Sequence, residues 1–323
     1  KRRVAAEVWR RFGDVPNYVE PFFGSGAVVL GRPALHNGRI ETVNDKDGYV
    51  SNFWRAVKAA PDEVAEHADW PVNENDLHAR HAWLVARSDA LSASLEGDPE
   101  WYDAKIAGWW VWGMCAWIGS GFCSGDGPWQ VVDGKLVHLG DAGRGVNRKL
   151  VHLGNAGRGV NRKLVHLGDA GRGVNRKLVH LGNAGMGAWF AALAERLRGV
   201  RVASGDWTRV CGDSPTVTQG LTGVFLDPPY HQAGRADLYN HEDEVADAVR
   251  AWAIERGTDK RMRIALCGYE GDHEMPGWDV YEWKASGGFG SQGEGRGRDN
   301  ARRERIWFSP ACLKPDAVQA VLL

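Results

Sequence analysis

Short runs of apolar residues alternate with longer amphipathic stretches along most of the chain. The short runs are mostly β-branched and bounded by Gly, Asn or Asp, which is typical of buried parallel strands. They span residues 18–20, 40–45, 200–206, 223–227 and 264–269. The amphipathic stretches have helical spacing and span residues 4–12, 49–60, 187–197 and 242–255. Two final runs, residues 278–283 and 303–308, predict strands joined by a Gly/Arg-rich loop. This order predicts an α/β fold with a doubly wound, Rossmann-like sheet that is mostly parallel and has an antiparallel edge hairpin.

Four of these strand-like runs end in an acidic residue. The four acids are Glu20, Asp45, Asp206 and Asp227. A single acid in such a place is most often a turn former or a helix cap. The carboxyl ends of parallel strands meet at one edge of a sheet, where doubly wound folds bind their ligands. Four acids at that edge therefore favour a binding site.

A repeat with a period of 14 residues interrupts the alternation. The sequence HLGDAGRGVNRKLV begins at His138, near-identical copies begin at His152 and His166, and a partial copy begins at His180. Each copy combines one short alternating run with a Gly-rich turn, which predicts a strand-and-turn unit. We interpret the repeats as part of an insertion into the α/β core. The predicted organisation is a first part of the core at residues 1–100, an insertion with a Trp-rich helix and the basic repeats at 101–187, and a second part of the core at 188–323.

Composition sets limits on the class of protein. The chain has 323 residues, of which 43% are hydrophobic and 25% charged, so it can bury a sizeable core and is not a disordered or fibrous protein. The longest apolar stretch, residues 109–119, is about half the ~20 residues that a membrane helix needs. The five cysteines lack the spacing of a zinc site or a disulfide framework. We therefore expect a cytoplasmic protein with reduced thiols, no membrane segment and no metal.

Charge is distributed unevenly along the chain. The formal net charge is −1, but residues 135–187 contain ten basic and two acidic residues, a local balance of +8 against −9 elsewhere. Arg144, Arg158 and Arg172 recur between glycines of the repeat. Such a segment can meet phosphates at regular intervals, although a solvated basic loop without any reading of sequence explains the pattern equally well.

The first predicted strand runs into the glycine turn EPFFGSG at residues 20–26. Glycines let the backbone approach a ligand closely, but the third glycine of a dinucleotide site is missing. An acid next to the turn suits a cationic ligand better than a pyrophosphate. Asp45 lies 19 residues after Gly26, close to the ~20-residue spacing at which an acid holds ribose hydroxyls. Together these features indicate a nucleoside that carries a positive group.

The second motif, DPPY at residues 227–230, follows a predicted buried strand. Its two prolines offer carbonyl oxygens but no N–H, and they hold Asp227 in an extended conformation. The Asp227 carboxylate and the Pro228 carbonyl can accept two hydrogen bonds from one exocyclic amine while the Tyr230 ring stacks on the base. In isolation such a sequence is as often a plain turn. Its position after a buried strand, in a chain that also has the glycine turn, favours a site for a planar amine.

Four motifs, in this order, resemble the D12 class of S-adenosylmethionine-dependent DNA adenine-N6 methyltransferases, the Dam-like family. They are the glycine turn at residues 20–26, VNDKD at 43–47, SGDW at 204–207 and DPPY at 227–230. The resemblance covers nearly all of the chain outside the repeats and implies a Rossmann-like methyltransferase sheet with S-adenosyl-L-methionine as cofactor. The implied cofactor-binding residues are Lys1, as the remnant of a Gly-Gly-Lys sequence, and Glu20, Pro21, Phe22, Gly24, Ser25, Gly26, Asp45, Asp206 and Trp207.

The resemblance also implies a mechanism. The catalytic loop is Asp227, Pro228, Pro229 and Tyr230, and the target adenine is flipped out of double-stranded DNA. Asp227 and the Pro228 carbonyl polarise N6, whose lone pair attacks the sulfonium methyl directly, without a metal or a covalent enzyme intermediate. The biological setting, whether restriction-modification with a cognate endonuclease, phage protection or regulation, is left open by the sequence.

The same resemblance places the region that contacts the target DNA in the insertion. A Trp-rich stretch at residues 101–129 has helical spacing, and a buried aromatic helix is the favoured interpretation for most of it. A basic loop at residues 287–305 and a candidate lid at residues 231–240 follow later in the chain. The candidate DNA-binding residues are Phe122, Trp129, Arg144, Arg158, Arg172, Tyr239, Arg296 and Arg298.

Two other functions are compatible with these motifs. An Asp-Pro-Pro-aromatic loop also serves methyltransferases that act on cytosine N4 or on RNA bases, although the early position of the cofactor turn favours the adenine arrangement. A DNA-binding protein without catalytic activity is less favoured, because all four residues of the catalytic loop are present.

Overall fold

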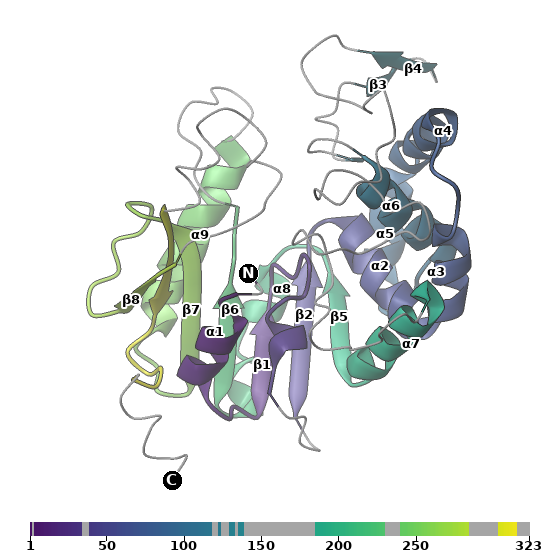
Figure 1. The fold of residues 1–323 in the computed structure, drawn as a ribbon. Helices are drawn as coiled ribbons and strands as arrows, with labels where there is room; N and C mark the ends of the chain where they lie inside the picture. Colours follow the sequence, from purple (N-terminus) through teal and green to yellow (C-terminus); the bar gives the residue numbers. More distant parts are fainter. Residues whose placement is uncertain are drawn as a thin grey trace. The chain divides into compact units, whose positions relative to one another are not determined.

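The computed structural model describes residues 1, 3–33, 39–117, 122–123, 129–132, 135–138, 185–229, 240–283 and 303–314 (Figure 1). For residues 129–132, 135–138 and 240–243 it describes the backbone only. The repeats between residues 139 and 184, the candidate lid before residue 240 and most of the basic loop after residue 283 lie outside these ranges. The strand-and-turn repeats, the lid and the basic loop therefore remain predictions from the sequence.

Within the described residues, seven strands form one sheet in the order β5-β2-β1-β6-β7-β9-β8. They are β1 (Asn17–Glu20), β2 (Ile40–Asp45), β5 (Val200–Ser204), β6 (Thr222–Leu226), β7 (Met262–Tyr269), β8 (Asp279–Glu282) and β9 (Glu304–Phe308). β1 pairs in parallel with β2 and β6, and β6 pairs in parallel with β7, whereas β9 is antiparallel to both β7 and β8. The predicted α/β fold with a mostly parallel sheet and an antiparallel edge is confirmed, and it is compatible with a Rossmann-like fold.

The order of the strands reverses beside β1. The chain continues from β1 to β2 on one side and later enters β6 on the other side of β1. Doubly wound sheets bind their ligands outside the carboxyl ends of the strands at such a switch point. The residues that follow β1, β2 and β6 therefore lie where such a sheet would bind a ligand.

The chain divides into two compact units. Unit 1 comprises Lys1–Asp45, Gly199–Arg201 and Asp206–Leu323, and unit 2 comprises Lys46–Arg198 and Val202–Gly205. The strand β5 has residues in both units. The glycine turn and the residues of the second motif both belong to unit 1.

Unit 1 holds most of the sheet and few helices. Its described helical segments are α1 (Ala5–Phe12), the 3-10 turn η1 (Val29–Gly31), α8 (Thr208–Cys211), the 3-10 turn η2 (Val217–Gln219) and α9 (Asn240–Arg256). α1 buries Val8, Trp9 and Phe12, and the indole N–H of Trp9 donates to the Val28 carbonyl over 2.8 Å. This contact ties α1 to the segment that follows the glycine turn.

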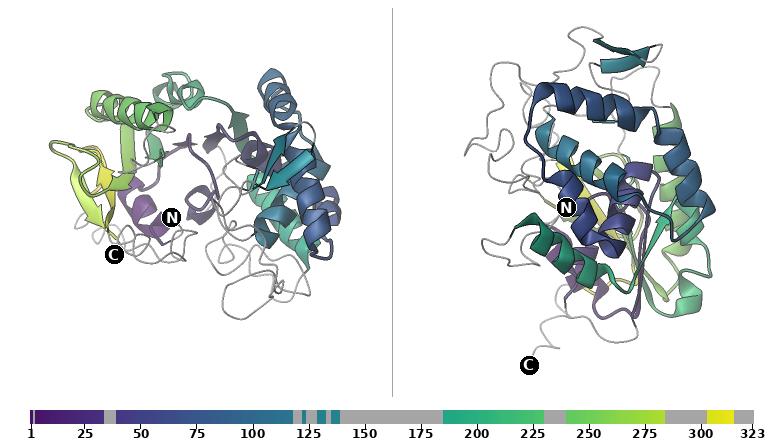
Figure 2. Two further views of the ribbon diagram at one scale, coloured as in Figure 1. Left: turned by 90° about the horizontal axis from the view of Figure 1, so that it is seen from above. Right: turned by 90° about the vertical axis from the view of Figure 1, so that its right-hand side faces the viewer.

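Unit 2 is mainly helical. Its described elements are α2 (Gly48–Ala59), α3 (Pro61–Ala68), α4 (Glu74–Val85), α5 (Ser88–Gly97), α6 (Ala104–Ala116), α7 (Met186–Leu197) and the antiparallel pair β3 (Trp129–Val132) and β4 (Lys135–His138). The helices coloured blue lie side by side in Figure 2. α6 packs closely on α3 at Gly108. A Cβ at this position would lie only 2.8 Å from the Val64 carbonyl oxygen, so the close contact requires glycine. Trp112 of α6 is fully buried, as the sequence predicts for this aromatic helix.

A buried arginine joins three segments of unit 2. Arg55 of α2 donates from Nε to the Val202 carbonyl over 2.9 Å. One of its terminal nitrogens also donates to the carbonyls of Leu95, Asp98 and Trp101, over 3.0, 2.9 and 3.3 Å. The guanidinium group thus donates to carbonyls at the end of α5, in the chain after α5, and in β5. Buried carbonyl groups need such hydrogen-bond donors.

Candidate active site

Three of the predicted site residues, Glu20, Asp45 and Asp227, lie at the carboxyl edge of the sheet in unit 1. Glu20 is the last residue of β1 and pairs with Val43, two residues before Asp45. Asp227 is the first residue after β6, on the other side of β1. Because neighbouring strands are only about 4.8 Å apart, the register brings these acids to one edge of the sheet.

The glycine turn is held by the end of β2. The Gly24 N–H donates to Asp45 Oδ2 over 2.8 Å, and the Phe23 N–H donates to the Asn44 carbonyl over 2.9 Å. The φ angles of Gly24 and Gly26 are +46° and +65°, a region that side chains disfavour. A Cβ at Gly24 would have no described atom within 4 Å. The turn therefore leaves room for a ligand to approach its backbone.

The carboxyl group of Glu20 lies inside the protein. Its side chain is almost fully buried, and its Oε2 accepts hydrogen bonds from the Tyr18 hydroxyl over 2.7 Å and from the Val29 N–H over 3.2 Å. Burial raises the pKa of Glu20 to about 8, although these two hydrogen bonds oppose the shift. Glu20 thus fastens the residues after the turn to β1, and its contact with a cofactor stays a prediction.

Asp206 and Trp207 follow β5 and differ in exposure. Asp206 is exposed, and its Oδ1 accepts hydrogen bonds from the backbone N–H of Thr208, over 3.0 Å, and from the Thr208 hydroxyl. The buried Trp207 ring stacks on Phe22 of the glycine turn, with centroids 6.4 Å apart and planes at 28°. Its other neighbour is Trp252 of α9, which it meets edge-on at 6.2 Å. The structure thus joins two of the predicted motifs through an aromatic pair.

The residues of the second motif lie at the end of β6. Asp227 is half-buried, Pro228 is buried and Pro229 is exposed, while Tyr230 lies outside the described residues. The Nζ of Lys1 is 3.0 Å from Asp227 Oδ1. The sequence predicts Lys1 as a cofactor contact, and the structure places its side chain on Asp227.

Lys1 lies between two carboxylates, since its Nζ is also 3.1 Å from Glu304 Oε2. Burial by itself lowers the pKa of Lys1, but the negative charges of Asp227 and Glu304 outweigh it, so that the pKa lies above its ordinary value. Lys1 therefore remains an ammonium ion at neutral pH.

Two residues of this edge were missed by reasoning from the sequence. Glu304 begins β9 and pairs with Tyr269, the last residue of β7, to which β9 runs antiparallel. No sequence pattern that we found indicates that β9 places Glu304 at the same sheet edge as Asp227. Tyr18 precedes Glu20 by two positions and therefore shares a face of β1 with it, a signal that strand periodicity does contain.

The candidate DNA-binding residues have different outcomes. Phe122 is only 5% exposed, and its ring packs on Trp117 and His81 with centroids 5.3 Å away in each case. Phe122 therefore lies in the interior of unit 2, and its contact with DNA stays a prediction. Trp129 lies in β3, of which only the backbone is described. The remaining candidates lie outside the described residues: Arg144, Arg158, Arg172, Tyr239, Arg296 and Arg298.

In comparisons with known proteins, no protein-family model and no curated protein matches the chain. Within the described ranges, no group of three or more His, Cys, Asp or Glu side chains is arranged to hold a metal ion. No described helix combines the length and the apolar character needed to cross a membrane. Any assignment of function rests on the geometry of the sheet edge.

Proposed function

We propose that this chain is a DNA methyltransferase of the Dam-like kind, which transfers the methyl group of S-adenosyl-L-methionine to N6 of adenine in double-stranded DNA. The observation that carries the proposal is the position of Asp227 and Pro228, directly after β6 and one strand away from the glycine turn that follows β1. A pair of acceptors for an amine thereby adjoins a turn suited to a nucleoside, at the switch point of the sheet.

The residues present fit a cationic nucleoside. Asp45 and Asp206 supply carboxylate oxygens for hydroxyl and amine donors, and the stacked pair of Phe22 and Trp207 supplies apolar ring surface. The open space at Gly24 admits a ligand close to the backbone. When bound, S-adenosyl-L-methionine supplies an activated methyl group on its sulfonium. In this proposal Asp45 holds the ribose, Asp206 and Trp207 hold the adenine ring, and residues 20–26 hold the methionine part.

Asp227 and Pro228 act on the target amine. The carboxylate and the carbonyl accept the two N–H groups of a flipped adenine, so that the N6 lone pair is directed at the methyl donor. A carboxylate offers about four acceptor positions, so the contact with Lys1 is compatible with a second donor. Most of the rate enhancement then comes from positioning. Tyr230 would stack on the flipped base.

The partner in this proposal is double-stranded DNA, which the basic segment at residues 135–187 attracts through its local charge of +8. The reaction needs no metal. DNA and the cofactor occur together in the cytoplasm, and we place the protein there.

The proposal is tested by transfer of labelled methyl from S-adenosyl-L-methionine to unmethylated duplex DNA, with the wild type and Asp227→Ala. We expect incorporation by the wild type and a loss of about a hundredfold or more in the variant, because removing one group positioned at the reacting atoms has effects of this size. Asp213→Ala is the matched control, since it removes an exposed carboxylate that pairs with Arg256 at 2.6 Å. Equal incorporation by all three proteins, or none by a wild type that binds the cofactor, would contradict the proposal.

A further inference from the structure

Three charged side chains form a continuous chain from β6 to β9 at the sheet edge. Asp227, Lys1 and Glu304 are linked by contacts of 3.0 and 3.1 Å, and their side chains are 21%, 18% and 13% exposed. The Lys1 ammonium also lies 5.5 Å from the centre of the Trp283 ring. Ion pairs that are this far removed from solvent are screened less than surface pairs, so each charge in the chain affects the others.

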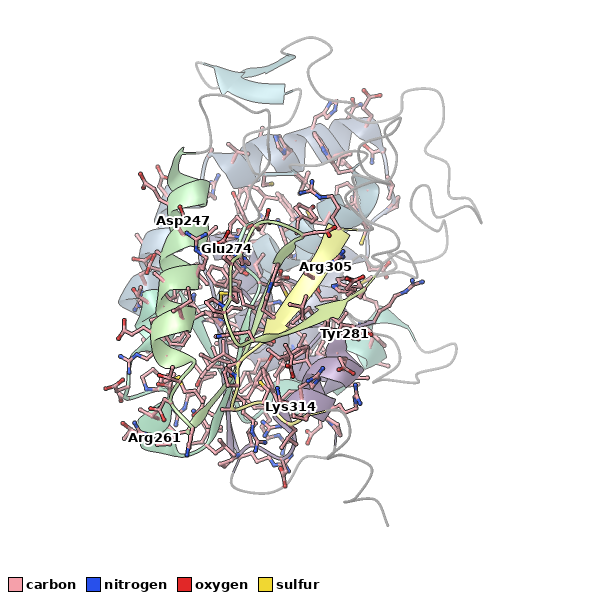
Figure 3. The ribbon with its side chains drawn as sticks, turned by 90° about the vertical axis from the view of Figure 1, so that its left-hand side faces the viewer. Asp247, Arg261, Glu274, Tyr281, Arg305 and Lys314 are labelled. Atoms are coloured by element: carbon pink, nitrogen blue, oxygen red, sulfur yellow. The ribbon has the colours of Figure 1, made fainter. Side chains whose placement is uncertain are left out.

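Glu304 and its neighbour Arg305 in β9 have different ionic partners. Successive residues of a strand point to opposite faces of the sheet. Figure 3 shows the next residue, Arg305, on β9, which lies beside the edge strand β8. Arg305 pairs with Glu270 at 3.0 Å, whereas Glu304 reaches Lys1. Two glutamates close to one sheet edge therefore hold two different cations.

We propose that Glu304 is a positioning residue of this site: it anchors the Lys1 ammonium, and the anchored ammonium fixes the orientation of the Asp227 carboxylate toward the target amine. The inference rests on the proposed function. A lysine side chain has considerable rotamer freedom, which a second carboxylate restricts. Because Lys1 is shared between two carboxylates, Asp227 is neutralised only in part and keeps its strength as an acceptor.

The test compares Glu304→Gln, which removes the charge and keeps the size, with Glu304→Asp, which keeps the charge. We expect kcat for methyl transfer to fall about tenfold in Glu304→Gln, the effect of losing one charged hydrogen bond at a distance from the reacting atoms. KM for the cofactor and for DNA should stay within about threefold, since the groups that bind them are unchanged. Glu304→Asp should recover part of the loss. Glu270→Gln is the matched control and should leave kcat unchanged.

A second measurement does not depend on activity. The protein is acetylated with a small reagent at fixed pH, and acetylation at the Lys1 Nζ, distinguished by fragmentation from acetylation at the α-amine of the same residue, is read by mass spectrometry of the peptide that contains Lys1. Only the neutral amine reacts, and the Glu304 charge is one of the groups that raise the pKa of Lys1. Glu304→Gln should therefore increase the rate of labelling severalfold, whereas Glu270→Gln should not.

The inference is overturned if kcat is unchanged in Glu304→Gln, if it falls only because less of the protein is folded, or if it falls equally in Glu270→Gln. Unchanged labelling of Lys1 in Glu304→Gln would also overturn it. The absence of transfer by the wild type would instead defeat the proposed function, and the positioning role of Glu304 with it. In that case, faster labelling of Lys1 in Glu304→Gln would still show that Glu304 anchors Lys1, whereas unchanged labelling would show that it does not.

Discussion

The protonation state of Glu20 at neutral pH is set by its burial at the end of β1. Its carboxyl group ends β1 inside unit 1, and burial raises its pKa to about 8. In the ligand-free protein it is therefore mostly neutral at pH 7. The sequence predicts an acid at this position from the end of the strand, but not that the acid holds a proton. That property follows from burial, which depends on the whole packed sheet.

The first prediction concerns stability against pH. The pKa of Glu20 is about 8 in the folded protein, against an ordinary value of 4.5. Between these values the folded state binds a proton that the unfolded state releases. The free energy of unfolding therefore falls as pH rises from about 5 to 8, by at most about 1.4 kcal/mol per pH unit. Glu20→Gln should remove this slope, as measured by urea unfolding at several pH values.

The control for this prediction is Glu63→Gln, since Glu63 is exposed in the first turn of α3. Its pH profile should run parallel to that of the wild type. If Glu20→Gln also runs parallel to the wild type, then Glu20 does not carry the extra proton.

At the scale of elements, the seven strands were predicted close to their observed bounds, because apolar β-branched runs ending in Gly, Asn or Asp are a strong signal. The helices α3, α4 and α5 were not predicted. Each buries only a few apolar side chains, such as Leu77 and Leu84 of α4, so the periodic signal is weak. Local signals were available at their starts, with Pro61 at the first turn of α3 and Asn73 as the cap of α4.

The second prediction concerns α2 and the segments that Arg55 joins. Arg55→Met keeps much of the side-chain volume but leaves four carbonyl groups without this donor. A lost hydrogen bond from a charged group costs about 1.5–3 kcal/mol, and the four share one guanidinium, so we expect a loss of about 3 kcal/mol in the free energy of unfolding. Urea unfolding followed by circular dichroism measures it.

Lys58→Met is the matched control, because Lys58 is a half-buried cation in the last turn of the same helix. Its effect should stay below about 0.5 kcal/mol, as for most substitutions of partly exposed side chains. Equal losses in the two variants would mean that the carbonyl contacts of Arg55 do not stabilise unit 2.

At the scale of the whole molecule, the candidate site combines residues that are far apart in the chain. The acids at the ends of β1, β2, β5 and β6 could be predicted, because parallel strands end at one edge. The ion pairs that surround Asp227 could not. The contact of Lys1 with Glu304 depends on how the antiparallel strand β9 returns along β7, and short patterns do not encode that pairing.

The third prediction concerns the charge of the 14-residue repeats. The salt dependence of DNA binding counts the phosphates that a protein neutralises, at a slope of about 0.9 per phosphate in a log–log plot. Replacing Arg144, Arg158 and Arg172 together by Gln should lower this slope by up to about 3 and weaken binding to DNA of any sequence. Fluorescence anisotropy between low and moderate salt measures it.

The control variant removes the same amount of positive charge, three arginines, from a part of the chain outside the repeats. Three arginines in and after α7, outside the repeats, are replaced by Gln: Arg196, Arg198 and Arg201. The slope should then remain that of the wild type. A repeat variant with an unchanged slope would mean that these arginines do not meet phosphates.

The central claim is that Asp227 directs a methyl group to N6 of adenine, and the identity of the methylated nucleoside tests it most directly. Duplex DNA is incubated with labelled S-adenosyl-L-methionine and either the wild type or Asp227→Ala, digested to nucleosides and separated. The account predicts label in N6-methyladenine with the wild type and none above background with Asp227→Ala. Label in N4-methylcytosine, label that persists without Asp227, or label in RNA alone would contradict it.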